Sequence, residues 1–176
     1  IRGNLLPDII DIENSHHRVS NGMYEIPDIK YYLENLDLNN DLHIGYLVHL
    51  LLDKYYVKDY LEKRKCENVF LNGEIYNDYD YLNYQLVKSF NLDLKKLEAI
   101  LQGDYHYQIK EDKLKDNLNY LKRKKNGQTK YLDFDSFKDF LLEVSLLISE
   151  EILNYINDFN PKRFEFTKYD IWHVNY

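Results

Sequence analysis

The feature that most constrains the fold is the stretch HIGYLVHLLLDKYY, residues 43–56, which is apolar on nearly all sides of a helix. A helix of this kind must be surrounded by other elements, because exposing any of its faces to water is unfavourable. The stretch therefore predicts a central buried helix, at about 41–62, with other helices packed around it. His49 and Asp53 stand in its middle, four residues apart and so on one face.

Helical periodicity continues along most of the chain from about residue 27. Further helices are expected at about 27–36, 75–90, 93–102, 110–125 and 133–159. Residues 1–26 are expected to be mostly irregular, and so is the tail from Pro161, where RFEFTKYDIW could form a short extended piece. We see no convincing alternation of apolar and polar residues. The sequence therefore predicts an all-α, single-domain bundle of about six to seven helices over residues 1–176.

Several helix ends carry residues that favour them. Pro27 suits the first turn of its helix, because its missing N–H has no partner there. The central helix can be capped by one of the polar residues 39–41, and the helix at 93–102 by Asp93. Gly103 is expected to end the latter.

The overall charge and composition exclude several classes of protein. A net charge of −7 argues against a nucleic-acid partner, which requires clustered lysine and arginine. The single Cys66 excludes an intramolecular disulfide and is typical of a reducing compartment. No apolar run reaches the roughly 18–20 residues of a membrane span. We therefore predict a cytoplasmic protein without stable membrane insertion, whose tyrosine-rich surface would suit a homodimer.

The pair formed by His49 and Asp53 has two interpretations. A buried carboxylate is unfavourable unless it meets a cation, a metal or several donors. The pair could form a structural hydrogen bond that ties the helix to a neighbour. It could also supply two ligands of a metal ion, since imidazole nitrogen and carboxylate oxygen both bind zinc. Gly45, one turn before His49, leaves the backbone bare and so allows another element to approach closely.

The N-terminal segment offers partners that favour the metal. In LLPDI, Asp8 follows a proline, where an extended chain could aim its carboxylate. In SHHR, only one of His16 and His17 can face a given centre. Asp8 and one of these two histidines make, with His49 and Asp53, a set of two histidines and two carboxylates. Such a set suits Zn²⁺, Fe²⁺ or Mn²⁺ with room for water.

The order of the segments GNLLPDI, SHHR, IPDIKYYLENL and GYLVHLLLDKYY resembles that of a zinc-dependent phospholipase C-like family of bacterial helical hydrolases. The similarity covers about residues 3–90. It implies a phospholipase C/P1 nuclease-like helical fold and the metal ligands Asp8, His16, His49 and Asp53. His16 takes the ligand position because it follows a serine, and His17 falls on an aromatic position of the family.

The resemblance also implies a function, which is hydrolysis of a small phosphoester by a metal-activated water. A bound divalent ion lowers the pKa of its water and neutralises charge on a phosphoryl oxygen. Asp53 would be the catalytic residue that orients this water. The alternative is a non-catalytic helical interaction protein with a vestigial or structural metal site.

Other residues could complete the site. The chain lacks the His-x-x-x-Glu pair with which the characterised enzymes extend their metal cluster. His17 and Asp78 are therefore candidates for a second metal or for contact with a ligand, with Asp80, His43 and His173 as further recruits. His43 lies off the face of His49 and is expected to be exposed or to face a partner. The tyrosines whose hydroxyls could orient an anion are Tyr46, Tyr55 and Tyr79.

Overall fold

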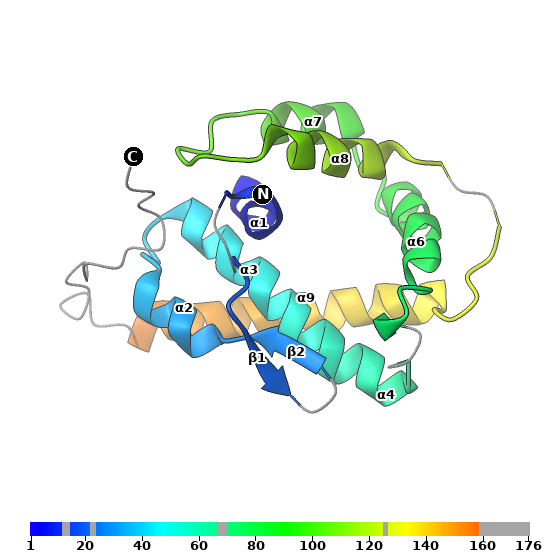
Figure 1. The fold of residues 1–176 in the computed structure, drawn as a ribbon, viewed down its shortest axis with the longest axis horizontal. Coiled ribbons are helices and arrows are strands. Elements are labelled where there is room, and N and C mark those ends of the chain that lie inside the picture. Colours follow the sequence, from blue (N-terminus) through cyan, green and yellow to red (C-terminus); the bar gives the residue numbers. More distant parts are fainter. Residues whose placement is uncertain (12–14, 22–23, 67–69, 125–126, 159–176) are drawn as a thin grey trace.

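The structure, a computed structural model, describes residues 1–11, 15–21, 24–66, 70–124 and 127–158. Helices dominate it, which confirms the predicted all-α class (Figure 1). The helices are α1 (Arg2–Ile9), α2 (Ile29–Asn35), α3 (Asp41–Tyr55), the π-helix η1 (Tyr56–Leu61), α4 (Glu62–Arg64), α6 (Tyr76–Ser89), α7 (Leu94–Leu101), α8 (Glu111–Lys122) and α9 (Phe134–Asp158). The predicted extended piece in the tail lies outside the described residues.

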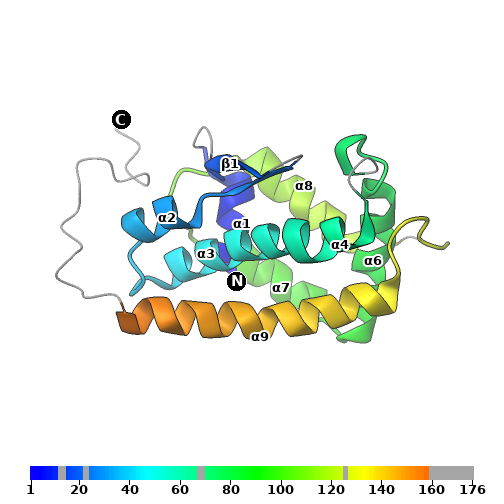
Figure 2. The same ribbon diagram turned by 90° about the horizontal axis from the view of Figure 1, so that it is seen from below.

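The central helix is present as predicted. Helices α3, η1 and α4 form one continuous rod from Asp41 to Arg64, and the Asn40 side chain caps its start by accepting a hydrogen bond from the backbone N–H of Leu42. Its buried residues include Tyr46, Leu47, Leu50 and Leu51 in α3 and Val57, Tyr60 and Leu61 in η1. The rod runs alongside α9, which packs against α3 (Figure 2).

Helix α1 crosses α3 where both helices carry a glycine. A Cβ on Gly3 would meet the backbone of Leu42, and a Cβ on Gly45 would lie 2.8 Å from the Asn4 nitrogen. The close approach expected at Gly45 is therefore confirmed. The expectation that this segment is irregular is wrong, because Leu6 and Ile9 are buried in the core and this burial outweighs the N–H that Pro7 lacks.

A β-hairpin follows α1 and is a second departure from the expected irregular N-terminus. Strands β1 (Arg18–Asn21) and β2 (Tyr24–Pro27) are antiparallel, with Arg18 opposite Pro27 and Ser20 opposite Glu25. They are the only strands in the described residues. Pro27 consequently ends a strand rather than beginning a helix, and Asp28 caps α2 by accepting a hydrogen bond from the Tyr31 N–H at 3.2 Å.

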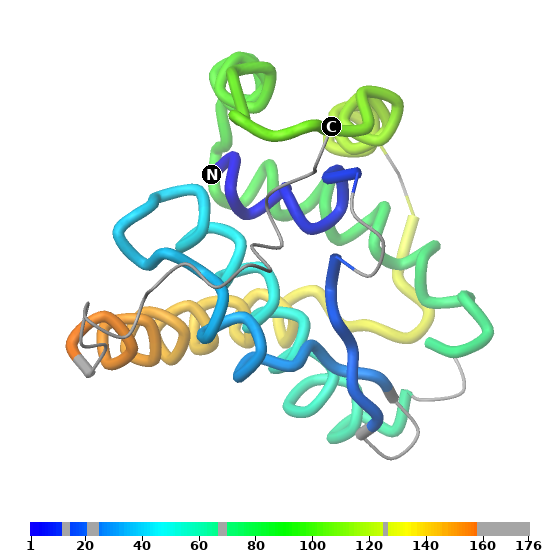
Figure 3. Tube along the Cα trace, turned by 60° about the vertical axis from the view of Figure 1, so that its left-hand side comes forward, coloured from blue at the N-terminus to red at the C-terminus, as the bar shows by residue number. Residues whose placement is uncertain are grey.

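The remaining helices surround this centre. Helices α7 and α8 lie over α1 on the side away from α9 (Figures 1 and 3). Asp93 caps α7 as predicted, by accepting hydrogen bonds from the N–H groups of Lys95 and Lys96. Helix α6 packs against both α8 and α9. No helix in the described part of the chain has the length and apolar character that crossing a membrane requires.

Candidate metal centre

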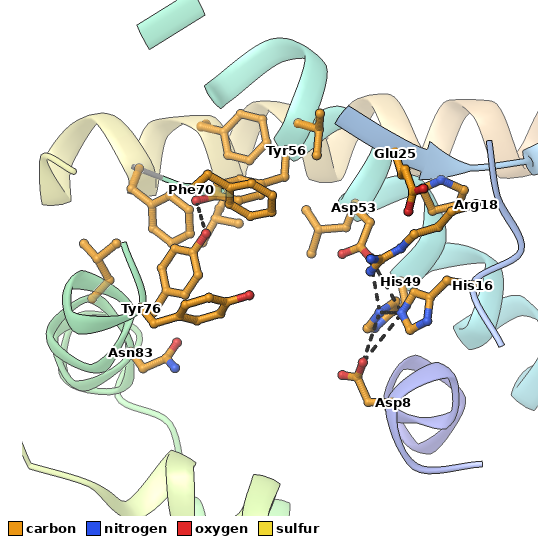
Figure 4. Close-up of a pocket in the computed structure, with 18 of the residues that line it drawn as sticks. Asp8, His16, Arg18, Glu25, His49, Asp53, Tyr56, Phe70, Tyr76 and Asn83 are labelled. Carbon is orange, nitrogen blue, oxygen red and sulfur yellow. Dashed lines mark hydrogen bonds and ion pairs between the residues drawn. The ribbon is translucent and has the colours of Figure 1, made fainter. Parts of the chain in front are cut away.

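Four of the predicted site residues lie together where α1, α3 and the segment before β1 meet (Figure 4). Asp8, His16 and His49 each offer a ligand atom within 4.8 Å of the others. The Nε2 atoms of His16 and His49 are 3.2 Å apart, and a carboxylate oxygen of Asp8 lies 3.6 Å from the first and 3.8 Å from the second. A carboxylate oxygen of Asp53 lies 3.7 Å from both nitrogens.

The close helix crossing fixes the orientation of His49. Because α1 approaches α3 so closely at Gly45, the carbonyl oxygen of Asn4 lies 2.8 Å from Nδ1 of His49. A carbonyl can only accept a hydrogen bond, so Nδ1 must carry the proton. In the neutral ring, Nε2 then carries no proton, and its lone pair faces Asp8 and His16.

A serine hydroxyl fixes the orientation of His16. Ser15 Oγ donates to the carbonyl oxygen of Pro7 at 2.7 Å, which uses its only proton. It lies 3.2 Å from Nδ1 of His16 and can only accept there. His16 therefore carries its proton on Nδ1 and presents Nε2 as a lone pair. The Pro7 carbonyl is available because it lies in the last turn of α1, where carbonyls lack helical partners.

Two buried tyrosines hold the segment that carries His16. The hydroxyls of Tyr32 and Tyr46 both donate to the backbone carbonyl of Ser15. The idea that the Tyr46 hydroxyl could orient an anion is therefore wrong, since this hydroxyl binds the backbone. Nothing in the local sequence signals the role of Ser15, because it depends on α1 lying next to the segment.

The geometry of Asp8, His16 and His49 suits a divalent ion. An ion at the centre of the triangle formed by the two Nε2 atoms and the Asp8 oxygen would lie about 2.1 Å from each of them. This distance matches Zn–N and Zn–O bond lengths. The two nitrogens and the Asp53 oxygen form a triangle of the same size. Two lone pairs at 3.2 Å repel each other unless a cation lies between them. The donor set therefore fits zinc or a similar ion.

Burial sets the protonation of the site. Burial, together with the neighbouring His49 and Arg18 and against the opposing charge of Asp8, lowers the pKa of His16 to about 4. A proton is thus disfavoured on His16 at neutral pH. Burial raises the pKa of Asp53, with Asp8 acting in the same direction and His49 and Arg18 in the opposite one.

The four side chains line one end of a pocket of about 840 Å³. Arg18 from β1 and Glu25 from β2 also line this end, and the Arg18 side chain extends toward Asp53 (Figure 4). The other end is formed mainly by aromatic and aliphatic side chains from η1, α6, α8 and α9 and from the segment before α6. The sequence did not reveal Arg18, because only the hairpin brings β1 to the end of the pocket.

The structure places the other candidates elsewhere. His17 stacks on Tyr31, with ring centroids 3.8 Å apart. Asp78 is buried, and its carboxylate accepts three backbone hydrogen bonds from Lys130, Tyr131 and Leu132, so its role is to hold the segment before α9. Neither lines the pocket.

The sequence also suggests His43, Asp80 and His173 as recruits for a second metal. His43 is buried, contrary to expectation, because its Nδ1 accepts from the Asp37 N–H at 2.9 Å and its Nε2 lies 2.7 Å from the Tyr107 hydroxyl. Asp80 forms an ion pair with Arg123. His173 lies outside the described residues.

The fold and the site together define an all-α protein with a histidine and carboxylate cluster in an aromatic-walled pocket. Comparison of the chain with protein-family models, curated proteins and solved structures finds no match.

Proposed function

We propose that this protein is a metal-dependent hydrolase of small phosphoesters. The observation that carries the proposal is the arrangement of His16 and His49. Their unprotonated Nε2 atoms face each other at 3.2 Å, with the carboxylates of Asp8 and Asp53 beside them. The ion is zinc or another divalent transition metal such as iron or manganese, because two nitrogens and two carboxylate oxygens suit all three.

The chain's own residues divide the work in the following way. When bound, such an ion lowers the pKa of a water molecule towards neutrality and neutralises charge on a phosphoryl oxygen. Asp8, His16 and His49 hold it. Asp53, whose carboxylate oxygen lies 3.7 Å from both Nε2 atoms, completes the ligand set or accepts a proton from the attacking water. The Arg18 guanidinium binds the remaining phosphoryl oxygens.

Two further considerations support the proposal. The resemblance of residues 3–90 to the phospholipase C-like family leads to the same four residues and to phosphoester chemistry. The net charge of −7 argues for a small substrate rather than a nucleic acid. With one cysteine in the chain, we assign the protein to the cytoplasm.

Metal analysis of the purified protein tests the proposal. We expect about one divalent ion per chain, its loss in His49→Ala, and its retention in His106→Ala, which removes an exposed histidine paired only with Asp104 in the described structure. Mono- and diesters of p-nitrophenyl phosphate then test the reaction class. A protein that binds no transition metal, or whose metal content is unchanged in His49→Ala, contradicts the proposal.

The alternative is a non-catalytic helical protein that pairs with a second copy of itself. It is favoured by an apolar stripe on the outer face of α9, formed by Leu142, Leu146, Leu153 and Ile156, which are between 39% and 68% exposed. Their spacings of four, seven and three residues give the seam of a two-helix contact, with Ser149 at its middle. A metal-loaded protein that hydrolyses no ester but is a dimer, and becomes a monomer in Leu146→Glu, would establish this alternative.

A further inference from the structure

The pocket has two chemically different ends. The end near the candidate metal centre carries charged and ionisable side chains, namely Asp8, His16, Arg18, Glu25, His49 and Asp53. The other end, here called the aromatic lobe, is lined by Tyr56, Val57, Phe70, Leu71, Tyr76, Tyr79, Leu82, Asn83, Tyr120, Phe137, Phe140 and Leu141. Figure 4 shows the two groups facing each other across the open space. A substrate that fills the pocket must therefore combine an ionic part with an apolar part.

The aromatic lobe offers little to a charged group. Among the described residues that line the pocket, Arg18 is the only lysine or arginine, and it lies at the metal end. Among the described residues of the lobe there is no carboxylate, and Asn83 is the only amide. A charged or many-hydroxyl group placed there would lose its hydration without gaining partners, which is unfavourable.

The tyrosine hydroxyls of the lobe are also partly withdrawn from a ligand. The hydroxyls of Tyr56 and Tyr79 lie 2.6 Å apart and bind each other. The Tyr76 ring packs edge-on against that of Tyr79, at 5.4 Å between centroids. The wall therefore presents ring faces and edges, which favour contact with another aromatic or a compact aliphatic group.

The lobe is large enough to hold the apolar part of a small substrate. The whole pocket holds about 840 Å³, and the metal end occupies part of it. Pockets of this size bury most of a drug-sized ligand, whose apolar part here would be one or two rings.

We propose that the substrate is a phosphoester of a compact apolar alcohol, with its ring or branched alkyl group in the aromatic lobe and its phosphate between Arg18 and the metal end. This inference rests on the proposed hydrolase function and specifies its substrate. In the reaction, water adds to phosphorus, the P–O bond to the alcohol breaks, and a proton from the water goes to the alcohol oxygen. The aromatic lobe selects the alcohol and takes no part in the bond changes.

The test compares methyl, phenyl and 1-naphthyl phosphates on the zinc-loaded protein and on Tyr76→Ala. Tyr76 is 59% exposed, so its removal opens the lobe without emptying the core. We expect KM to be lowest for the aryl esters, and to rise about tenfold for them in Tyr76→Ala while kcat stays within about twofold. The methyl ester should show no change. Tyr84→Ala, on the same helix but not lining the pocket, is the matched control and should behave as the wild type.

The outcomes separate this inference from the proposed function. If no ester of the series is hydrolysed, the proposed function fails. If the esters are hydrolysed with equal KM, and Tyr76→Ala affects none selectively, only the substrate inference fails. Hexadecyl phosphate tests whether the pocket binds a long lipid chain. A KM for it below that of 1-naphthyl phosphate would overturn the inference that the substrate carries a compact alcohol.

Discussion

The Nε2 atoms of His16 and His49 face each other at 3.2 Å because backbone carbonyls of helix α1 orient both rings through their Nδ1 atoms. The carbonyl of Asn4 accepts from His49 directly, and the carbonyl of Pro7 accepts from Ser15, whose hydroxyl oxygen then accepts from His16. The same short helix carries Asp8. Helix α1 thus supplies one candidate ligand and sets the tautomers of the two others, so the geometry of the candidate metal centre depends on how α1 lies against α3.

Replacing Ser15 with alanine tests the orientation of His16. Ser15→Ala removes the oxygen that holds the proton of His16 on Nδ1, so the ring can rotate or change tautomer and Nε2 is no longer fixed as a ligand. Removing a group that holds a metal ligand by a hydrogen bond typically weakens metal affinity by about 10–100-fold. We expect a loss of that size in the zinc dissociation constant, measured by competition with a chelator.

Ser149→Ala is the matched control for Ser15→Ala. Ser149 lies on the exposed face of α9, and its hydroxyl also donates to a backbone carbonyl, that of Ser145. Both variants lose one such bond, but only Ser15→Ala should weaken zinc binding. Equal zinc affinity in the two variants would show that Ser15 has no part in positioning His16.

A methyl group at Gly45 tests the crossing of α1 and α3. Gly→Ala within an open helix ordinarily stabilises by about 1 kcal/mol. At Gly45 the new Cβ would lie 2.8 Å from backbone atoms of Gly3 and Asn4, so α1 must move away. We expect Gly45→Ala to lower the free energy of unfolding by about 2 kcal/mol, from urea denaturation. We also expect weaker zinc binding, since the Asn4 carbonyl leaves His49. A stabilised variant would contradict the crossing.

Much of the central helix was predictable because its determinants are local. The apolar surround of residues 43–56 required a buried helix, and the spacing of His49 and Asp53 placed them on one face. Asn40 and Asp93 act as helix caps through contacts with residues next to them in the chain. The bare backbone at Gly45 predicted a close neighbour, although it could not say which element that is.

The parts that the sequence did not reveal depend on contacts between distant segments. Helix α1 forms despite its proline because its apolar side packs on α3. His43 is buried by Tyr107, and Asp78 binds backbone more than fifty residues away, so neither role has a local signal. The aromatic lobe, likewise, is assembled from η1, α6, α8, α9 and the segment before α6, and only the fold brings them together.

The buried carboxylate of Asp78 should act as a structural residue. Its two oxygens accept the N–H groups of Lys130, Tyr131 and Leu132 at 2.7–2.9 Å. In Asp78→Asn the amide NH₂ cannot accept, which leaves one or two of these donors unpaired. We expect the free energy of unfolding to fall by about 3 kcal/mol with zinc content unchanged, measured by urea denaturation and elemental analysis. Asp116→Asn, at an exposed position of α8, should leave both unaltered.

A cluster around Glu151 joins α3 to α9 and should make stability depend on pH. The hydroxyls of Tyr55 and Tyr155 donate to its two carboxylate oxygens, and Nζ of Lys54 lies 3.5 Å away. Burial alone would raise the pKa of Glu151. The bonds from Tyr155 and Tyr55 and the charge of Lys54 outweigh it, so the pKa lies below its ordinary value of 4.5.

The sign of this pH dependence follows from the lowered pKa. Above pH 4.5 the carboxylate is charged in both states and contributes its full stabilisation; as the pH falls, the unfolded chain takes up the proton first and the contribution is lost. We expect Glu151→Gln to be about 1–2 kcal/mol less stable than the wild type at pH 7, and the difference to shrink as the pH falls from 5 to 3. Urea denaturation across this range measures it. The exposed Glu150→Gln should match the wild type throughout, and a Glu151→Gln difference that grew towards acid pH would refute the assignment.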